Sequence, residues 1–331
     1  MAWMELSLDT TSEAVDWVCT LLAGTRYKGD IKIVECAEDP PSPWAFTLYL
    51  HLPDHAQPQA QEIADVLLPL HRTGIATELQ VRIVDDPASS SSYPQGVASP
   101  SLPGYPLPRI HRVGDRFVIM TDELAQSSYS PAPHELTLHF KTSLAFGSGL
   151  HPATQLSLRL LEKHITPDMK TLDLGSGSGI LSVAIAKLGA QVLAVDNDAI
   201  AVEATQDAVQ RNDVSSQVTV MQGSLGQGSE LGHWMGGEVL GEVKAIDPTP
   251  ATDHPGIAPF DLIVANILAR VHIALAPDFK RSLTPSGLLI TAGFTKDYEE
   301  AVAAALGKEG FEAVDCERLQ EWVAWMYRLN P

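Results

Sequence analysis

The residues whose spacing most clearly suggests chemistry form a glycine-rich loop between a predicted strand and a predicted helix. Segment 172–180 reads Leu-Asp-Leu-Gly-Ser-Gly-Ser-Gly-Ile, with glycines at Gly175, Gly177 and Gly179. Glycine lets the backbone turn tightly and lets a ligand approach it closely, and the first turn of the following helix offers unpaired N–H groups to a carboxylate. Open α/β sheets bind ligands where their strands end in such loops. The loop therefore predicts a ligand-binding site.

A carboxylate at the end of the next predicted strand narrows the ligand class. Asp196 follows Gly175 by 21 residues, and at this strand tip it can accept hydrogen bonds from both ribose hydroxyls of an adenosine-containing ligand. A dinucleotide fingerprint GxGxxG requires Gly or Ala at position 180, where this chain has Ile180. The loop instead has the form DxGxGxG, which resembles motif I of the class I S-adenosylmethionine-dependent methyltransferases. Asp198 is expected only to cap the helix that follows.

Composition excludes several classes of protein. The chain has 331 residues, 45% hydrophobic and 19% charged, which is typical of a soluble globular protein. Its 22 Lys and Arg against 41 Asp and Glu give a net charge of −19, which disfavours direct nucleic-acid binding and favours a basic partner. No apolar run reaches the roughly 18 residues of a membrane span. Three cysteines without a CxxC pair predict neither disulfides nor a metal site, so we expect a cytoplasmic location.

The first part of the chain predicts a separate α+β domain. Within residues 1–86, strand-like and helix-like segments follow the order β-α-β-β-α-β, the split βαβ order of a ferredoxin-like domain. These segments are residues 3–8, 12–23, 31–36, 46–52, 59–70 and 78–84. Leu79, Val81 and Ile83 show the period of two that is typical of a half-buried strand. Residues 87–108 contain six prolines and four consecutive serines, which predicts an extended linker.

Residues 109–331 predict a Rossmann-like α/β domain. Strand-like segments alternate with helix-like ones, and this alternation implies right-handed crossovers and a parallel sheet. The expected strands are 116–120, 135–140, 171–174, 191–195, 218–221, 261–265 and 288–292, with closing strands near 313 and at 323–329. The expected helices are 155–163, 180–188, 200–211, 273–282 and 298–308. Segment 224–259 is longer than such a fold needs, and we expect it to be a disordered insertion.

Two further motifs point to one family. Segment 145–154 reads AFGSGLHPAT, and segment 264–268 reads VANIL. Together with the glycine loop they resemble the ribosomal protein L11 methyltransferase (PrmA) family, whose members carry an AFGTGxHxTT-like loop, a GCGSGIL-like loop and a VANIL tract in this order. The resemblance covers about residues 109–331. The predicted ferredoxin-like domain agrees with it, because that family uses such a domain, joined by a linker, to recognise its protein substrate.

The resemblance implies S-adenosyl-L-methionine as the cofactor. It implies that the cofactor is contacted by Phe146, Thr154, Gly175, Gly177, Gly179, Asp196 and Asn266. Thr154 would close over the methionine end, Asp196 would hold the ribose, and the Asn266 amide would lie near the sulfonium and the entering amine, as the catalytic residue. Gly175 would allow close backbone approach, and Phe146 would form an apolar wall beside the transferred methyl.

The chain departs from the family pattern at several positions. Ser148, Leu150 and Ala153 stand where the family often has Thr, and Ser176 replaces the usual Cys. Ser224 stands at the position after a strand where many class I enzymes place an Asp on the adenine amine. Adenine recognition is therefore expected to use the backbone or Gln222.

The implied reaction is N-methylation of lysine and α-amino groups of ribosomal protein L11, a basic protein substrate. Methyl transfer to an amine is a direct displacement, to which the enzyme contributes geometry, desolvation and a route for the proton. About one lysine amine in a thousand is neutral at pH 7, so desolvation or a proton acceptor helps. His151 could accept the proton or could serve only as a structural hydrogen-bonding group. Two alternatives stay open, a methyltransferase of small-molecule amines and a non-catalytic S-adenosylmethionine-binding module.

Overall fold

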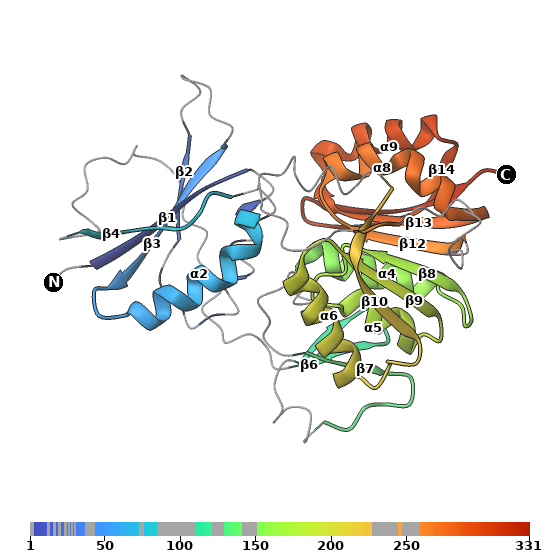
Figure 1. The fold of residues 1–331 in the computed structure, drawn as a ribbon, viewed down its shortest axis with the longest axis horizontal. Coiled ribbons are helices and arrows are strands. Elements are labelled where there is room, and N and C mark those ends of the chain that lie inside the picture. The colour runs from blue at the N-terminus through green and yellow to red at the C-terminus, as the bar shows by residue number, and fades with distance from the viewer. Residues whose placement is uncertain are drawn as a thin grey trace. The chain divides into compact units, whose positions relative to one another are not determined.

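The described residues of the chain form two compact units, which divide at residue 109 (Figure 1). This computed structural model describes residues 3–11, 14–15, 18, 21–22, 25, 27, 29, 31–36, 44–72, 76–84, 110–120, 129–140, 151–226, 244–246 and 259–331. None of the helices in these ranges is both long and apolar enough to cross a membrane. The predicted linker, residues 87–108, lies outside the described residues, so the division into 1–86, 87–108 and 109–331 stays a prediction.

The first unit is built on a four-stranded antiparallel sheet in the order β2-β3-β1-β4. Its elements are β1 (Trp3–Thr10), β2 (Lys32–Glu35), β3 (Phe46–Pro53), α2 (Gln57–Arg72) and β4 (Gln80–Val84). The described residues between 14 and 22 are helical. Each pair of strands joined by a helix is split by a third strand, because β3 lies between β1 and β2, and β1 lies between β3 and β4. The predicted ferredoxin-like arrangement is therefore confirmed.

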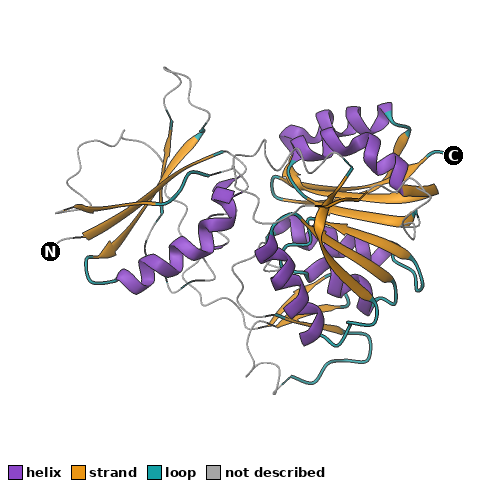
Figure 2. Cartoon of the chain, viewed as in Figure 1, coloured by secondary structure: helices purple, strands orange, loops and turns teal. Residues whose placement is uncertain are grey.

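The two faces of this sheet differ in polarity. Leu6, Leu50 and the other inward residues of β1 and β3 are buried on one face, where α2 lies along the sheet (Figure 2). On the other face Glu5 accepts a hydrogen bond from Arg82 Nε at 2.5 Å. The prediction of a half-buried β4 is wrong for two residues, since Val81 and Ile83 are 55% and 62% exposed. Val81 and Ile83 lie opposite the buried Leu6 and Met4 of β1, so their exposure means that the described helices do not cover this edge of the sheet.

The second unit contains an eight-stranded sheet in the order β11-β10-β9-β8-β12-β13-β15-β14. The strands are β8 (Lys170–Leu174), β9 (Gln191–Asp196), β10 (Val218–Leu225), β11 (Lys244–Ile246), β12 (Phe260–Asn266), β13 (Leu283–Thr295), β14 (Phe311–Leu319) and β15 (Trp322–Leu329). Neighbours are parallel except that β15 is antiparallel to β13 and β14. The chain builds outward from β8 on one side and then from β12 on the other. The boundary between β8 and β12 is thus the topological switch point, where such sheets bind ligands.

Helices cover both faces of the large sheet, as Rossmann-like folds require. Helices α4 (Pro152–His164), α5 (Ile180–Lys187) and α6 (Ala199–Arg211) lie on one face, and α8 (Ala269–Ser282) and α9 (Glu299–Lys308) lie on the other (Figure 1). A short 3-10 helix, η1 (Lys296–Tyr298), precedes α9. Because both faces are covered, the central strands are apolar along their length, as in Leu262–Ala265. The predicted α/β alternation is confirmed.

A separate three-stranded sheet precedes α4. It consists of β5 (Ile110–Val113), β6 (Phe117–Met120) and β7 (Leu136–His139) in that order. The sequence predicted β6 and β7 but not β5, a four-residue strand in which only Val113 is buried. Asn212, which ends α6, joins this sheet to the helices, since its Nδ2 donates to the His139 carbonyl at 2.8 Å.

The expected disordered insertion at 224–259 is wrong in two places. Strand β10 runs on to Leu225, and Lys244–Ile246 form β11, which pairs in parallel with residues 223–225. The pattern in the sequence did not reveal this, because three residues are too few to show a period. Residues 227–243 and 247–258 lie outside the described residues.

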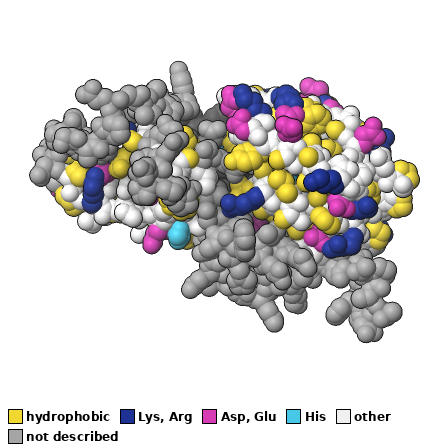
Figure 3. All heavy atoms as spheres, turned by 90° about the horizontal axis from the view of Figure 1, so that it is seen from above, with side chains coloured by type: hydrophobic (Ala, Val, Ile, Leu, Met, Phe, Trp, Pro, Cys, Tyr) yellow, Lys and Arg dark blue, Asp and Glu magenta, His cyan; other side chains and the backbone are white. Residues whose placement is uncertain are grey.

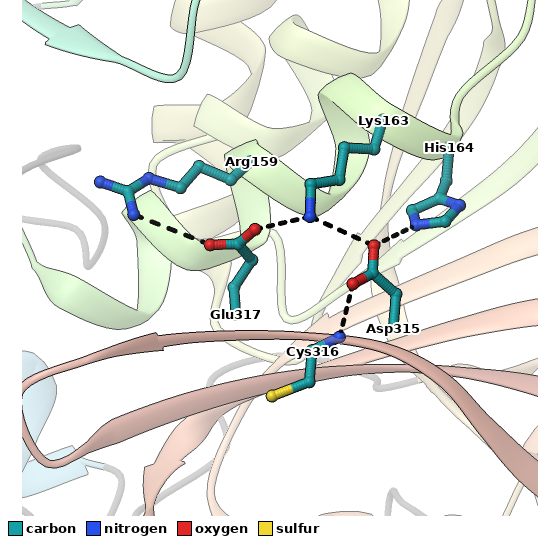
Figure 4. Close-up of polar contacts among 6 residues, drawn as sticks. All are labelled: Arg159, Lys163, His164, Asp315, Cys316 and Glu317. Carbon is teal, nitrogen blue, oxygen red and sulfur yellow. Dashed lines mark hydrogen bonds and ion pairs between the residues drawn. The ribbon is translucent and has the colours of Figure 1, made fainter.

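An ion-pair cluster, defined as Arg159, Lys163, His164, Asp315 and Glu317, fastens α4 to β14 (Figure 4). Lys163 Nζ lies 2.6 Å from Glu317 Oε1 and 3.2 Å from Asp315 Oδ2. His164 Nε2 lies 2.8 Å from the same Asp315 oxygen, and Arg159 lies 3.7 Å from Glu317. The cluster therefore holds the C-terminal half of the helix whose first turn contributes to the candidate site.

Candidate active site

The glycine-rich loop lies at the end of β8, beside the ends of β9 and β12. Its backbone is tied to β9, because the N–H groups of Gly175 and Ser176 both donate to the Val195 carbonyl, at 2.8 and 3.1 Å. Gly175 and Gly179 have φ angles of +76° and +79°. A Cβ on Gly175 would lie 2.6 Å from Ile267 Cγ2, and one on Gly179 would lie 2.9 Å from Thr205 Cα. Glycine is required here by both conformation and space.

Asp196 ends β9 and holds the loop in place. Its Oδ2 accepts from the Gly177 N–H at 2.9 Å, and its Oδ1 accepts from the Asp198 N–H at 3.0 Å. Burial raises the pKa of Asp196 to about 6, although the backbone hydrogen bonds oppose the rise. The group is thus mainly ionised at pH 7 and can accept further hydrogen bonds. The predicted cap is confirmed, since Asp198 Oδ1 accepts from the Ile200 N–H at the start of α6.

Thr154 and Asn266, 112 residues apart, meet at the same edge of the sheet. Asn266 ends β12, and Thr154 lies in the first turn of α4. The Nδ2 of Asn266 donates a hydrogen bond to Thr154 Oγ1, at 3.3 Å. Asn266 Oδ1 is buried and has no hydrogen-bond partner among the described residues. A buried acceptor without a donor costs free energy, so the site fits a ligand that brings an N–H group to this oxygen. The Asn266 oxygen, the glycine loop and Asp196 together could bind a nucleoside that carries an amino acid, together with an amine.

His151 caps α4 at its N-terminus. Its Nδ1 accepts from the Ala153 N–H at 3.2 Å, and its ring stands edge-on to Trp322, with 4.4 Å between ring centroids. Burial lowers the pKa of His151 to about 3. A base that takes up a proton near neutral pH needs a pKa near that pH. The geometry therefore favours the structural alternative for His151 over the role of proton acceptor.

Asp173 is a buried acid to which the sequence pattern assigned no separate role. It lies in β8 with no exposed surface, and its Oδ2 accepts from Ser182 Oγ of α5 at 2.6 Å. Burial raises the pKa of Asp173 to about 7, and the charge of Asp196 adds to the rise. Apolar Leu172 and Leu174 on either side signalled a buried strand. The partner Ser182 could not be identified without the fold.

The other residues predicted for the site are Gln222, Ser224 and Phe146. Gln222 lies beside Asp196 in the register of β10 and β9, and its Nε2 donates to the Asn197 carbonyl at 3.1 Å. Ser224 is a strand residue opposite Ala245, so its predicted position after the strand is wrong. Phe146 lies outside the described residues. The described ranges contain no group of three or more His, Cys, Asp and Glu side chains that could hold a metal ion.

Comparisons with known proteins agree along nearly the whole chain. The family model described as ribosomal protein L11 methyltransferase (PrmA) matches residues 109–330. A Chloroflexus aurantiacus protein named ribosomal protein L11 methyltransferase is 38% identical, over 99% of this chain and 98% of its own length. A Herpetosiphon aurantiacus protein of the same name is 36% identical, over 99% of each chain.

A solved structure shares the fold. The crystal structure of a ribosomal protein L11 methylase from Lactobacillus delbrueckii subsp. bulgaricus superposes with a TM-score of 0.52 and 23% identity, covering 67% of this chain and all of that one. The family match and the two relatives confirm the resemblance inferred from the three motifs. Given the family match and the extent of identity, this chain belongs to the ribosomal protein L11 methyltransferase (PrmA) family.

Proposed function

We propose that this chain transfers methyl groups from S-adenosyl-L-methionine to lysine ε-amino and α-amino groups of ribosomal protein L11. Family membership makes it an S-adenosylmethionine-dependent methyltransferase of that protein, and the proposal adds the type of amine and the residues. The observation that carries it is the buried Asn266 Oδ1, without a partner among the described residues, beside Thr154 and the loop at Gly175.

In this proposal the glycine loop and three side chains bind the cofactor. The Asp196 carboxylate accepts hydrogen bonds from the ribose, and the backbone at Gly175, Gly177 and Gly179 allows close approach. Thr154 closes over the methionine end, with Phe146 as an apolar wall. S-adenosylmethionine, when bound, supplies a methyl group on a positively charged sulfur.

Asn266 is proposed as the catalytic residue that positions the amine. Its Oδ1 accepts a hydrogen bond from the amine, while the bond from its Nδ2 to Thr154 fixes the rotation of the amide. An amine nitrogen held in this way would be placed to take the methyl group that S-adenosylmethionine would supply, in a direct displacement. An amide does not take up a proton, so the lysine must arrive neutral, and removal from water favours its neutral form.

Residues 1–86 are proposed as the domain that recognises the protein substrate, joined by 87–108 to residues 109–331. The support is that the first unit has its own sheet and core, whereas the cofactor motifs all follow residue 109. A tethered recognition domain raises the effective concentration of substrate at the active site.

Charge is proposed to assist the encounter with a basic protein. The chain carries a net charge of −19, but the surface over α8 and α9 shows basic and acidic side chains interspersed rather than one acidic patch (Figure 3). Attraction of L11 would therefore come from the electrostatic field of the whole chain more than from the surface over α8 and α9. A cytoplasmic location and the absence of direct nucleic-acid binding stay predictions.

The proposal is tested by incubating the purified chain with isotopically labelled S-adenosylmethionine and L11, and then mapping the label by mass spectrometry. We expect label on lysine ε-amino and α-amino groups, and none on L11 with both kinds of amine blocked. Label on another side chain would contradict the amine assignment. Transfer to small amines but not to L11 would favour the small-molecule alternative, and binding without any transfer would favour the non-catalytic one.

A further inference from the structure

His272, in the first turn of α8, is a buried histidine that the proposed reaction does not use. It has no exposed surface, and its ring packs edge-on to Phe294, with 5.4 Å between ring centroids. Its Nε2 lies 2.9 Å from the Ala292 carbonyl oxygen. Because a carbonyl oxygen only accepts, Nε2 must carry the proton and donate it. Burial lowers the pKa of His272 to about 4 although the carbonyls of Ala292 and Ile267 oppose the shift, so the ring is neutral at pH 7.

The Ala292 carbonyl oxygen also accepts a hydrogen bond from the backbone of the residue that follows Asn266. The Ile267 N–H donates to it at 3.0 Å, so one oxygen accepts from both Ile267 and His272. Ala292 is the residue of β13 directly opposite Asn266 of β12. The register between β13 and β15 shifts at this point, between Thr291 and Phe294. Such irregularities are known to redirect side chains next to active sites.

The segment formed by Asn266 and Ile267, at the end of β12, has close backbone contacts on two sides. Gly293 has a φ of +93°, and a Cβ on it would lie 2.5 Å from the Ile267 oxygen and 2.7 Å from the Ile267 nitrogen. The backbone of β13 therefore presses directly on the peptide that follows Asn266. From the other side, the Ile267 side chain reaches the Gly175 backbone, where an added Cβ would lie 2.6 Å away. The position of Asn266 thus depends on where residues 292–293 lie.

We propose that His272 is a positioning residue for methyl transfer. By donating to the Ala292 carbonyl it fixes the irregular segment of β13 that contacts Asn266 and Ile267, and thereby fixes the Asn266 amide. The inference rests on the proposed role of Asn266. Without the histidine, the Ala292 carbonyl loses one of the two donors described above, and this part of β13 can shift together with Asn266 and Ile267. An in-line displacement is sensitive to such shifts, since misplacement by about 1 Å can cost about a hundredfold in rate.

The test compares His272→Gln with His272→Met. The two new side chains are similar in length, but only glutamine carries an N–H that can donate to Ala292. We expect His272→Met to lower the single-turnover rate of L11 methylation at saturating cofactor by about tenfold, and His272→Gln to stay within about threefold of the parent. The dissociation constant for S-adenosylmethionine, measured by calorimetry, should change by less than about threefold in both.

A readout independent of activity is the hydrogen exchange of the Ile267 amide, followed by NMR without cofactor. We expect exchange to be faster in His272→Met than in the parent and in His272→Gln, because the acceptor of this amide is less firmly held. Calorimetric stoichiometry gives the folded fraction of each variant. If His272→Met does not fold, His272→Phe takes its place, because it keeps the ring contact with Phe294 and lacks the donor.

A double-mutant cycle separates this inference from the proposed function. In the Asn266→Ala background, His272→Met should lower the rate little further, because the histidine acts through Asn266. A parent-like rate in His272→Met, equal losses in the methionine and glutamine variants, or multiplying effects in the double variant would overturn the role of His272 alone. A parent-like rate in Asn266→Ala would overturn the proposed role of Asn266 itself, and that of His272 with it.

Discussion

Replacing Asp196 by Ala should weaken S-adenosylmethionine binding while the fold survives. In the proposed site the carboxylate accepts from the ribose, and hydrogen bonds to a charged group contribute about 1.5 to 3 kcal/mol. At about 1.4 kcal/mol per tenfold change, this corresponds to a rise of about ten- to 150-fold in the dissociation constant. The N–H groups of Gly177 and Asp198 also lose their acceptor, so the loop should become less ordered as well.

The assay is calorimetric titration of the parent and the variant with S-adenosylmethionine, together with denaturant unfolding of both. The matched control is Asp198→Ala, two residues away, which removes the cap of α6. This control should cost about 1 kcal/mol of unfolding free energy, as lost caps do, and should leave cofactor affinity nearly unchanged. Parent-like affinity in Asp196→Ala, or an equal loss in the control, would refute the ribose assignment. Preferential binding of NAD by the parent would refute the cofactor itself.

Five further outcomes are expected. Cofactor affinity should fall as pH drops below about 6, the pKa of Asp196, in titrations from pH 5 to 8, and this dependence should be weaker in Asp196→Asn. The pKa of Asp196 is higher in the folded than in the unfolded chain, so its contribution to stability is complete below about pH 4 and is lost as pH rises through about 6. Between these pH values the unfolding free energy of the parent should therefore fall by more than that of Asp196→Asn. Asn266→Ala should lower the single-turnover rate more than cofactor affinity, because the amide organises the reacting geometry; equal losses would place it in the cofactor pocket only. A chain starting near residue 107 should bind S-adenosylmethionine but show a steeply raised KM for L11 in steady-state assays, whereas unchanged efficiency would contradict recognition by residues 1–86. Asp315→Ala should lower unfolding free energy by about 1 kcal/mol in denaturant titrations, less at high salt, because the ion-pair cluster is partly exposed; an effect independent of salt would rule out the ion pairs as its source.

Features that depend on neighbouring residues could be predicted from the sequence. The glycine loop, the cap at Asp198 and the alternation of strands with helices are encoded within a few residues of each other, by conformational freedom, side-chain reach and apolar period. The order of the strand-like and helix-like segments predicted both folds. The motif at 264–268 marked Asn266 as a candidate, and the family resemblance that it supports is confirmed.

Features that depend on which segments meet across a sheet were decided only by the tertiary structure. Thr154 and Asn266 are 112 residues apart, and their contact follows from where α4 and β12 end. The burial that raises the pKa of Asp173 comes from the elements packed around its strand, and the exposure of Val81 comes from the absence of a described helix over that edge of the sheet. A local pattern specifies which face of an element is apolar, but not what lies against that face. Only the packed chain brings His272 to the Ala292 carbonyl, because the partners of a buried polar group are set by the topology that surrounds it.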